Sequence, residues 1–173
     1  MIGSQKYNSN IISISRNGGV IDWGDDITQI VREFNINEKE NTGINCFCFP
    51  FGETNEFFVG QENASISKCR LHTQGHSSES HIDNNFMKHQ GPIIGLDMHP
   101  KIQSKNTEVS NLLLSIGQDQ GICLWNPKQL QIPYFSIETE NEVYDIQWSP
   151  VHPSVFATCD GLGNIDLWDL TKD

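Results

Sequence analysis

Apolar residues along the chain come in short runs that are separated by clusters of Gly, Asn, Asp and Pro. The runs are rich in Ile, Val and Phe, residues that favour strands, and the clusters between them are rich in residues that favour turns. Short strand-like runs at regular intervals predict an all-β protein.

Four stretches of equal length share one arrangement of apolar positions: IISISRNGGVIDWG (11–24), FFVGQENASISKCR (57–70), LLSIGQDQGICLWN (113–126) and FATCDGLGNIDLWD (156–169). In each stretch one apolar residue stands twelve positions before a Trp or Cys, and a second stands three positions before it. A turn sequence (RNGG, ENAS, QDQG or GLGN) lies between the two apolar arms. Asn-Gly and related pairs accept the positive φ that a tight hairpin needs. Each stretch is therefore predicted to be a β-hairpin.

The hairpins repeat at a regular distance along the chain. Their anchor residues, Trp23, Cys69, Trp125 and Trp168, are separated by 46, 56 and 43 residues. A hairpin ending in Trp-Asp, with a period in the low to mid forties, is typical of four-stranded propeller blades. The longest interval contains two polar insertions, 72–85 and 101–111, at places where loops are expected.

A further strand is predicted before three of the hairpins, over 43–49, 91–98 and 142–148. Proline follows each of these runs and ends the strand, because it has no N–H to donate. Within the third run, Tyr144 and Trp148 alternate with polar residues, and we expect both to lie in the core between blades. The stretch 25–34 has helical spacing, but the repeat favours a strand there.

The chain of 173 residues is expected to form a single partial propeller domain, with approximate blades over 1–40, 41–88, 89–137 and 138–173. The first blade holds little more than two strands before residue 24, and no outermost strand follows Trp168. We therefore expect an open arc, either a fragment or a structure that a partner completes. Its two exposed apolar faces make it prone to self-association.

The third unit is similar to the WD-repeat family in the strings KHQGPIIGLD and SIGQDQGICLWN. This resemblance implies a structural hydrogen-bond network formed by His89, Ser115, Asp119 and Trp125. A buried indole N–H needs an acceptor, and a chain of Ser, His and Asp groups satisfies each member in turn.

The other units depart from this pattern. The residues at the corresponding positions are Ser13, Asn17 and Trp23 in the first unit, Val59, Asn63 and Cys69 in the second, and Thr139, Thr158, Leu162 and Trp168 in the fourth. The network is expected to be lost in the second unit, and only the third unit is strongly specified.

Three longer strings resemble consecutive repeats of the dynein intermediate chains, the cytoplasmic type in particular. They are GINCFCFPFGETNEFFVGQENASI, HQGPIIGLD and VYDIQWSPVHPSVFATCDGLGNIDLWDL, and the likeness extends over about residues 8–170. It implies a non-catalytic scaffold in a dynein motor complex, with a propeller that binds the motor heavy chain and supports cargo or adaptor attachment. Light chains are further implied partners, and the implied location is the cytoplasm, at the cytoskeleton. A WD-repeat adaptor unrelated to motors and an axonemal intermediate chain are the alternatives.

Composition narrows the classes of partner. The chain has 22 acidic and 11 basic residues, a net charge of −11 and a pI near 4.8. Such a surface repels phosphate backbones and anionic lipids, so we expect neither nucleic acid nor membrane as a partner. No apolar run approaches the roughly 18 residues needed to cross a bilayer, and we expect no secretory route.

Catalysis, cofactors and metals are not expected. A Ser–His–Asp set is present, but there is no G-x-S-x-G motif, and no Gly-rich phosphate-binding loop precedes a helix. Cys69, His72, His76 and His81 could donate to zinc, which leaves a metal-dependent hydrolase as a remote alternative, but their spacing matches no closed site. The five cysteines contain no C-x-x-C pair and are interpreted as reduced core thiols.

Overall fold

The computed structural model describes residues 11–23, 28–36, 42–71, 82–100, 111–128 and 132–172. In these ranges the regular elements are all strands, which confirms the all-β prediction. None of them is an apolar helix of membrane-spanning length. The strands are β1 (Ile11–Ile14), β2 (Gly19–Trp23), β3 (Ile30–Asn35), β4 (Ile44–Cys48), β5 (Glu56–Gln61), β6 (Ser65–Arg70), β7 (Ile82–Met87), β8 (Ile93–Met98), β9 (Leu113–Gly117), β10 (Gly121–Trp125), β11 (Phe135–Glu138), β12 (Val143–Trp148), β13 (Val155–Asp160) and β14 (Ile165–Asp169).

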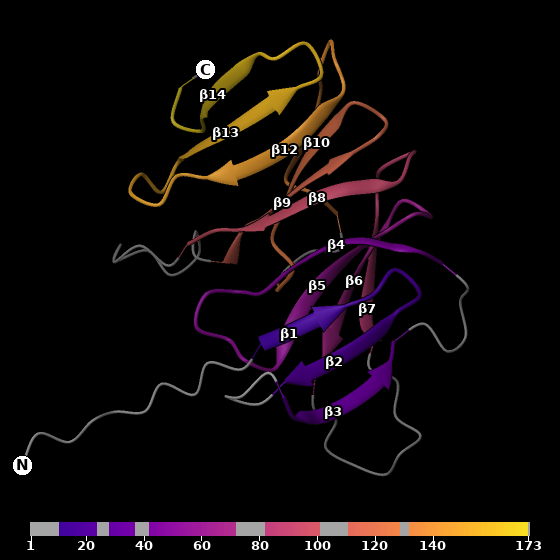
Figure 1. Cartoon of the computed structure of the whole chain (residues 1–173). Coiled ribbons are helices and arrows are strands. Elements are labelled where there is room, and N and C mark those ends of the chain that lie inside the picture. Colours follow the sequence, from indigo (N-terminus) through magenta and orange to yellow (C-terminus); the bar gives the residue numbers. More distant parts are fainter. Residues whose placement is uncertain are drawn as a thin grey trace, which may run out of the picture.

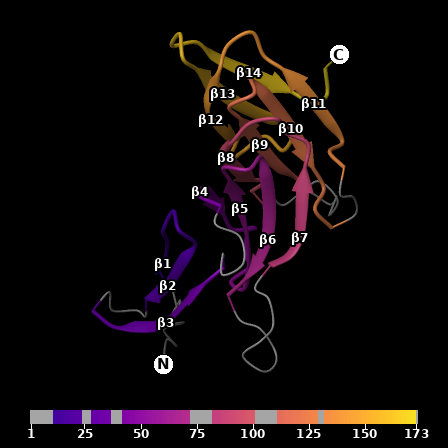
Figure 2. The same ribbon diagram turned by 90° about the vertical axis from the view of Figure 1, so that its right-hand side faces the viewer.

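The strands form four antiparallel sheets in chain order, as predicted. Sheet 1 is β1-β2-β3, sheet 2 is β4-β5-β6-β7, sheet 3 is β8-β9-β10-β11 and sheet 4 is β12-β13-β14. Figure 1 shows the sheets following one another from the indigo sheet 1 to the yellow sheet 4, and Figure 2 shows the same order from the side. Consecutive sheets pack face to face, and the described strands form no closed barrel.

The four hairpins have the same register. The two apolar columns that stand twelve residues apart in the sequence pair directly across each hairpin: Ile11 with Trp23, Phe57 with Cys69, Leu113 with Trp125, and Phe156 with Trp168. Each hairpin turn also contains one residue with positive φ, namely Gly18, Ala64, Gln120 or Gly163. The turn length sets the register, and the register decides which side chains share a face.

Strand β3 pairs with β2, so the ambiguous stretch around residue 30 is a strand and not a helix. Its helical spacing, Ile30, Val31 and Phe34, arises because the ladder shifts register between Asp22 and Trp23. An extra residue in one strand changes the two-residue alternation, and the apolar positions then imitate a helical period. A similar shift between Lys68 and Cys69 occurs where β6 pairs with β7.

The innermost strands β4, β8 and β12 share a β-bulge near their start. The register shifts between Ile44 and Cys46, between Ile93 and Gly95, and between Val143 and Asp145. The prediction that Tyr144 lies in the core is wrong, because this residue is the extra one in its bulge and its side chain is 58% exposed. Trp148, beyond the bulge, is buried as predicted.

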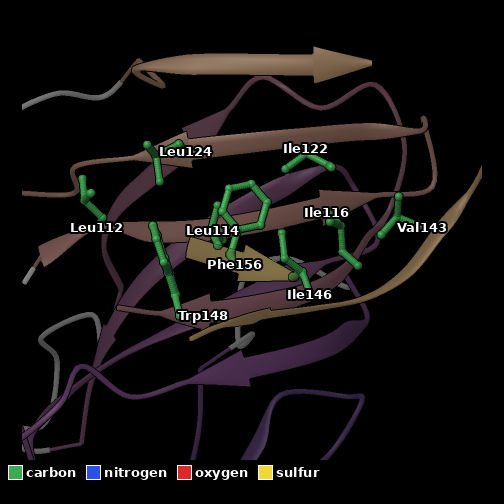
Figure 3. Packing of buried hydrophobic residues seen from close by; sticks show 9 residues of the cluster. All are labelled: Leu112, Leu114, Ile116, Ile122, Leu124, Val143, Ile146, Trp148 and Phe156. Atoms are coloured by element: carbon green, nitrogen blue, oxygen red, sulfur yellow. The ribbon is translucent and has the colours of Figure 1, made fainter. Parts of the chain in front are cut away.

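The core consists of three apolar clusters, one at each boundary between consecutive sheets. Figure 3 shows the cluster between sheets 3 and 4, where Leu114, Ile116 and Ile122 of sheet 3 meet Trp148 and Phe156 of sheet 4. The rings of Trp148 and Phe156 lie 5.6 Å apart in an edge-to-face arrangement. Each inner sheet is therefore buried on both faces, which holds the four sheets in one body.

Replacing Leu114 with Ala should lower the free energy of unfolding by about 2–5 kcal/mol, because it leaves a cavity at the boundary of sheets 3 and 4. The matched control is Leu162→Ala, at a side chain exposed in the β13–β14 turn, which should change it by less than about 0.5 kcal/mol. Urea denaturation followed by tryptophan fluorescence measures both, and equal effects would contradict the packing described.

Candidate functional site

The four residues of the third-unit network lie in one continuous chain of hydrogen bonds. The Trp125 indole N–H donates to Ser115 Oγ over 2.8 Å. Ser115 Oγ lies 2.8 Å from His89 Nε2, and His89 Nδ1 lies 3.0 Å from Asp119 Oδ1. Ser115 and Trp125 come from β9 and β10, whereas His89 stands before β8 and Asp119 in the β9–β10 turn. The chain thus joins three segments of sheet 3.

The donor and acceptor capacity of these groups determines which atom carries the proton in each hydrogen bond. A carboxylate only accepts, so His89 Nδ1 carries the proton donated to Asp119. In the neutral imidazole Nε2 is then an acceptor, and the Ser115 hydroxyl donates to it. The same hydroxyl oxygen accepts from Trp125, so every polar group in the chain has a partner.

Asp119 ties the network to the backbone. Its Oδ2 accepts from the Gln90 N–H at 2.6 Å, and its Oδ1 accepts from the Gly121 N–H at 3.2 Å. Burial alone would raise the pKa of Asp119, but the hydrogen bonds from Gln90, His89 and Gly121 outweigh burial and lower it. The carboxylate therefore clamps the segment before β8 to the β9–β10 turn.

The network is built for structural support rather than for attack on a substrate. Ser115 is completely buried, and its hydroxyl is held between His89 and Trp125. A nucleophile must reach the atom that it attacks, and nothing can approach this oxygen without opening the sheet.

An indole–hydroxyl bond recurs at the equivalent place in two other sheets. Trp23 donates to Ser13 in sheet 1, and Trp168 donates to Thr158 in sheet 4, each over 2.9 Å. In sheet 2 Cys69 stands at the anchor position, and its thiol contacts the Ser67 carbonyl at 3.9 Å. These bonds brace the hairpin at the end opposite its turn.

One position separates sheet 3 from the others, and the sequence analysis missed it. Gly117 leaves space for the His89 ring, since a Cβ there would lie 2.6 Å from Nδ1. The equivalent residues in the other hairpins are Ser15, Gln61 and Asp160, all polar. In sheets 2 and 4 the polar side chain at this position forms hydrogen bonds of its own.

In sheet 2 the substitute network is buried. The Gln61 side-chain oxygen accepts from Ser67 at 3.0 Å and from Ser65 at 2.5 Å. Ser65 also receives support from Asn63, whose oxygen accepts from its backbone N–H. The expected loss of the network in the second unit is thus accompanied by a different set of bonds. A Gln four residues after Phe57, the first apolar position of this hairpin, was the available signal.

In sheet 4 the substitute is Asp160. Its carboxylate accepts from the Asn164 backbone N–H at 2.8 Å and from the Asn164 and Asn141 side chains, each at 2.9 Å. These bonds, led by that from the Asn164 side chain, lower the pKa of Asp160. Asn141 precedes β12 as His89 precedes β8, so Asp160 links the same two segments as the His89–Asp119 pair. An Asp at the start of a turn signals this role in the sequence.

Polar bonds also cross the boundaries between sheets. Asn45 of sheet 2 donates to the Ile93 carbonyl at 3.0 Å, and the Trp148 N–H of sheet 4 donates to Asp97 at 2.7 Å. Burial raises the pKa of Asp97, although the bond from Trp148 opposes the shift. His99 Nε2 lies 2.8 Å from the Pro153 carbonyl and therefore donates to it. These bonds fix the position of each sheet relative to its neighbour.

The loops on one side of the sheets carry exposed apolar side chains. Figure 1 shows the β4–β5 and β12–β13 loops on the same side of the molecule. Phe51 and Val151 stand in these loops and are 63% and 67% exposed. Phe51 borders a hollow at the boundary of sheets 2 and 3, whose floor is Phe58 and Met98. We call these loops and this hollow the apolar rim.

The described residues hold no group of three or more His, Cys, Asp or Glu side chains that could bind a metal ion. His72, His76 and His81 lie outside the described residues. All five cysteines are free thiols. Burial raises the pKa of Cys46 and of Cys123 to about 12, so these thiols stay protonated and unreactive at neutral pH.

Comparison with known proteins reveals relatives in sequence. The chain is 32% identical over 177 residues to the cytoplasmic dynein 1 intermediate chain of Drosophila melanogaster, and the match covers 100% of this chain and 26% of that relative. It is 27% identical over 126 residues to the dynein axonemal intermediate chain 4 of Rattus norvegicus, covering 72% of this chain and 14% of that one. The chain thus spans about a quarter or less of these relatives. No protein-family model matches it.

A solved structure shares the fold. A chain in the crystal structure of the mitotic checkpoint complex superimposes with a TM-score of 0.72, covering 94% of this chain and 46% of that chain. The two sequences are 17% identical, so this likeness concerns the fold alone.

Replacing Ser115 with Ala should lower the free energy of unfolding by about 2–4 kcal/mol, because Trp125 and His89 would each lose a buried partner. Ser13→Ala is the matched control, since it removes the hydroxyl from the equivalent but exposed Trp23–Ser13 bond. It should cost less than about 1 kcal/mol. Urea denaturation measures the difference, and a larger cost at Ser13 would show that the network adds nothing.

Replacing Asp119 with Asn should lower the free energy of unfolding at neutral pH and should make it less dependent on pH in acid. A carboxyl with a lowered pKa contributes stability that is present above its unfolded value, about 3.9, and is lost as the pH falls below it. The variant should therefore be less stable at pH 7 by about 1–3 kcal/mol, and its stability should fall less steeply between about pH 5 and pH 2. Glu140→Gln, at an exposed side chain, controls for loss of charge. Parallel pH profiles for wild type and Asp119→Asn would contradict this role.

Proposed function

Because the chain is a WD-repeat β-propeller segment homologous over its whole length to the dynein intermediate chains, we propose that it is a non-catalytic subunit of a dynein motor complex. The observation that carries this proposal is the 32% identity that extends across every sheet described. The closer and longer match to the cytoplasmic relative than to the axonemal one favours a cytoplasmic, cytoskeleton-associated protein.

The chain's part in such a complex is rigid presentation of a binding surface. Its inner sheets are buried on both faces, and Asp119 and Asp160 clamp the hairpin turns at the end of the sheets opposite the apolar rim. Stiff sheets hold loop side chains in place, so a partner binds without ordering the scaffold first. Chemical work such as ATP hydrolysis would belong to the partner.

We place the heavy-chain contact on the apolar rim. Phe51 and Val151 project from loops and contribute little to any core, and the hollow beside Phe51 reaches the buried Phe58 and Met98. Exposed aromatic residues beside a hollow are the kind of group that anchors protein interfaces. Lys68 and Lys128, with Glu53 and Glu56, supply a polar border of both charges, as interface rims commonly have. Light chains and cargo adaptors are expected in the same assembly.

An epitope-tagged chain recovered from cell extract should bring down the dynein heavy chain and light chains. Phe51→Ser should reduce recovery of the heavy chain at least about fivefold, which corresponds to loss of roughly 1 kcal/mol of binding free energy. Met87→Ser is the matched control, because Met87 is equally exposed but lies on the outer strand β7. It should leave recovery unchanged. Mass spectrometry of the recovered proteins measures both.

Recovery of a different complex without dynein subunits would support a WD-repeat adaptor unrelated to motors. Recovery of dynein subunits with both variants alike would keep the chain in the motor complex but remove the contact from the apolar rim.

A further inference from the structure

The hollow of the apolar rim is formed by the two inner sheets. One wall comes from the β4–β5 loop and from strands β5 and β6 of sheet 2, and the other from the ends of strands β8 and β10 of sheet 3. Each of these sheets packs against a neighbouring sheet on both faces. The hollow therefore belongs to a fully packed boundary and not to an uncovered sheet face.

Phe51 stands in a tight turn on the sheet 2 wall. The Glu53 N–H donates to the Pro50 carbonyl at 3.0 Å and closes a four-residue turn. Gly52 has a φ of 80°, and a type II turn requires a positive φ at this third position. The turn thus sets the place where the Phe51 side chain leaves the backbone, although that side chain is 63% exposed.

Lys128 is held in a similar way on the sheet 3 wall. Its backbone N–H donates to the Asn126 side-chain oxygen at 3.2 Å. Asn126 is buried, and its amide group donates to the Tyr134 hydroxyl at 2.9 Å. The backbone on both sides of the hollow is therefore fixed before any partner binds, which lowers the entropy cost of binding.

The charged side chains around the hollow differ in their availability to a partner. Glu56 pairs with Lys68 at 2.9 Å and lies 3.7 Å from Arg70. Lys128 and Glu53 are both exposed, and neither has an ion-pair partner among the residues that the structure describes. The available cation is thus on the sheet 3 wall, and the available anion is on the sheet 2 wall.

We propose that the hollow binds a segment of a partner protein in which an apolar side chain stands next to an acidic residue. The apolar side chain packs on the floor, Phe58 and Met98, beside the ring of Phe51. The acidic residue pairs with Lys128 and lies away from Glu53, whose charge repels it. This inference rests on the proposed function, because it gives a chemistry to the contact placed on the apolar rim.

The overall charge of the chain makes the hollow a selective place for such a segment. A net charge of −11 repels an acidic partner from the protein as a whole. The hollow differs, because its lining contains two acidic side chains, Glu53 and Glu56, and two basic ones, Lys68 and Lys128. An acidic residue therefore meets no net repulsion from the side chains that line the hollow.

Photo-cross-linking in cell extract tests the proposal. Phe51 is replaced with p-benzoylphenylalanine, a photoreactive amino acid with an aromatic side chain, in an epitope-tagged chain. On irradiation it should couple to a partner segment that contains an apolar residue next to Asp or Glu, and mass spectrometry of the cross-linked peptides identifies that segment. The same replacement at Met87, which is exposed on the outer strand β7, is the control and should not couple to this segment.

A charge exchange then tests the pairing with Lys128. Lys128→Glu in the photoreactive chain should lower the yield of the cross-link at least about fivefold, because it places like charges together. Lys88→Glu is the matched control: Lys88 is exposed at the opposite end of sheet 3, and the change in net charge is the same. It should leave the yield unchanged. Replacing the acidic residue of the identified segment with Lys should restore the yield in the Lys128→Glu chain, and far-UV circular dichroism checks that each variant is folded.

The proposal is overturned by cross-linking to no protein, by a cross-linked segment without an acidic residue, by equal yields from Lys128→Glu and Lys88→Glu, or by a charge exchange that restores nothing. A segment of the expected chemistry in a protein outside the dynein complex would support this inference and contradict the proposed function. A dynein segment of another chemistry would support the proposed function and overturn this inference.

Discussion

The hairpin register, in which the first apolar residue of each hairpin pairs with the anchor twelve positions later, is the constraint on which the rest of the structure depends. It places Leu113 opposite Trp125 and Ile116 opposite Ile122, so that alternate residues go to opposite faces of the sheet. The indole of Trp125 then reaches the hydroxyl of Ser115 two residues along the neighbouring strand. A slip by one residue would exchange the two faces and would undo the packing at both boundaries of the sheet. The turn, the anchor and the core are thus consequences of one pairing.

Much of the fold could be predicted from the sequence, because the pattern of apolar and turn residues repeats in each hairpin. The hairpins and the strands before them follow from apolar spacing and turn residues, and the strand at β3 follows from its place in the repeat although its own spacing is helical. Tyr144 could not be placed correctly, because a bulge leaves no mark in a run of alternating residues. Gln61 and Asp160 were missed for another reason. A search for a histidine network does not look for side chains that replace the histidine.

The sheet faces and the loops of this fold have different roles, and this difference fits the proposed binding function. Sheet faces are occupied by contacts between sheets, and polar groups there such as Ser115 and Asp97 have hydrogen-bond partners within the protein. The side chains left over for partners are those on loops, such as Phe51. Phe51 lies in a loop whose position is set by the sheets, and because its side chain is mostly exposed its replacement should leave the fold intact.

Gly117 and His89 depend on each other, and this dependence limits which mutations the third sheet can accept. A side chain added at Gly117 would collide with the imidazole, whereas loss of the imidazole alone would remove one hydrogen-bond partner from Asp119 and one from Ser115. Each change by itself should therefore be destabilising, whereas sheets 2 and 4 have neither the glycine nor the histidine and form other hydrogen bonds there. The two kinds of blade are therefore separated by an epistatic valley. A lineage would cross it only by a paired change, or through an intermediate stabilised elsewhere in the propeller.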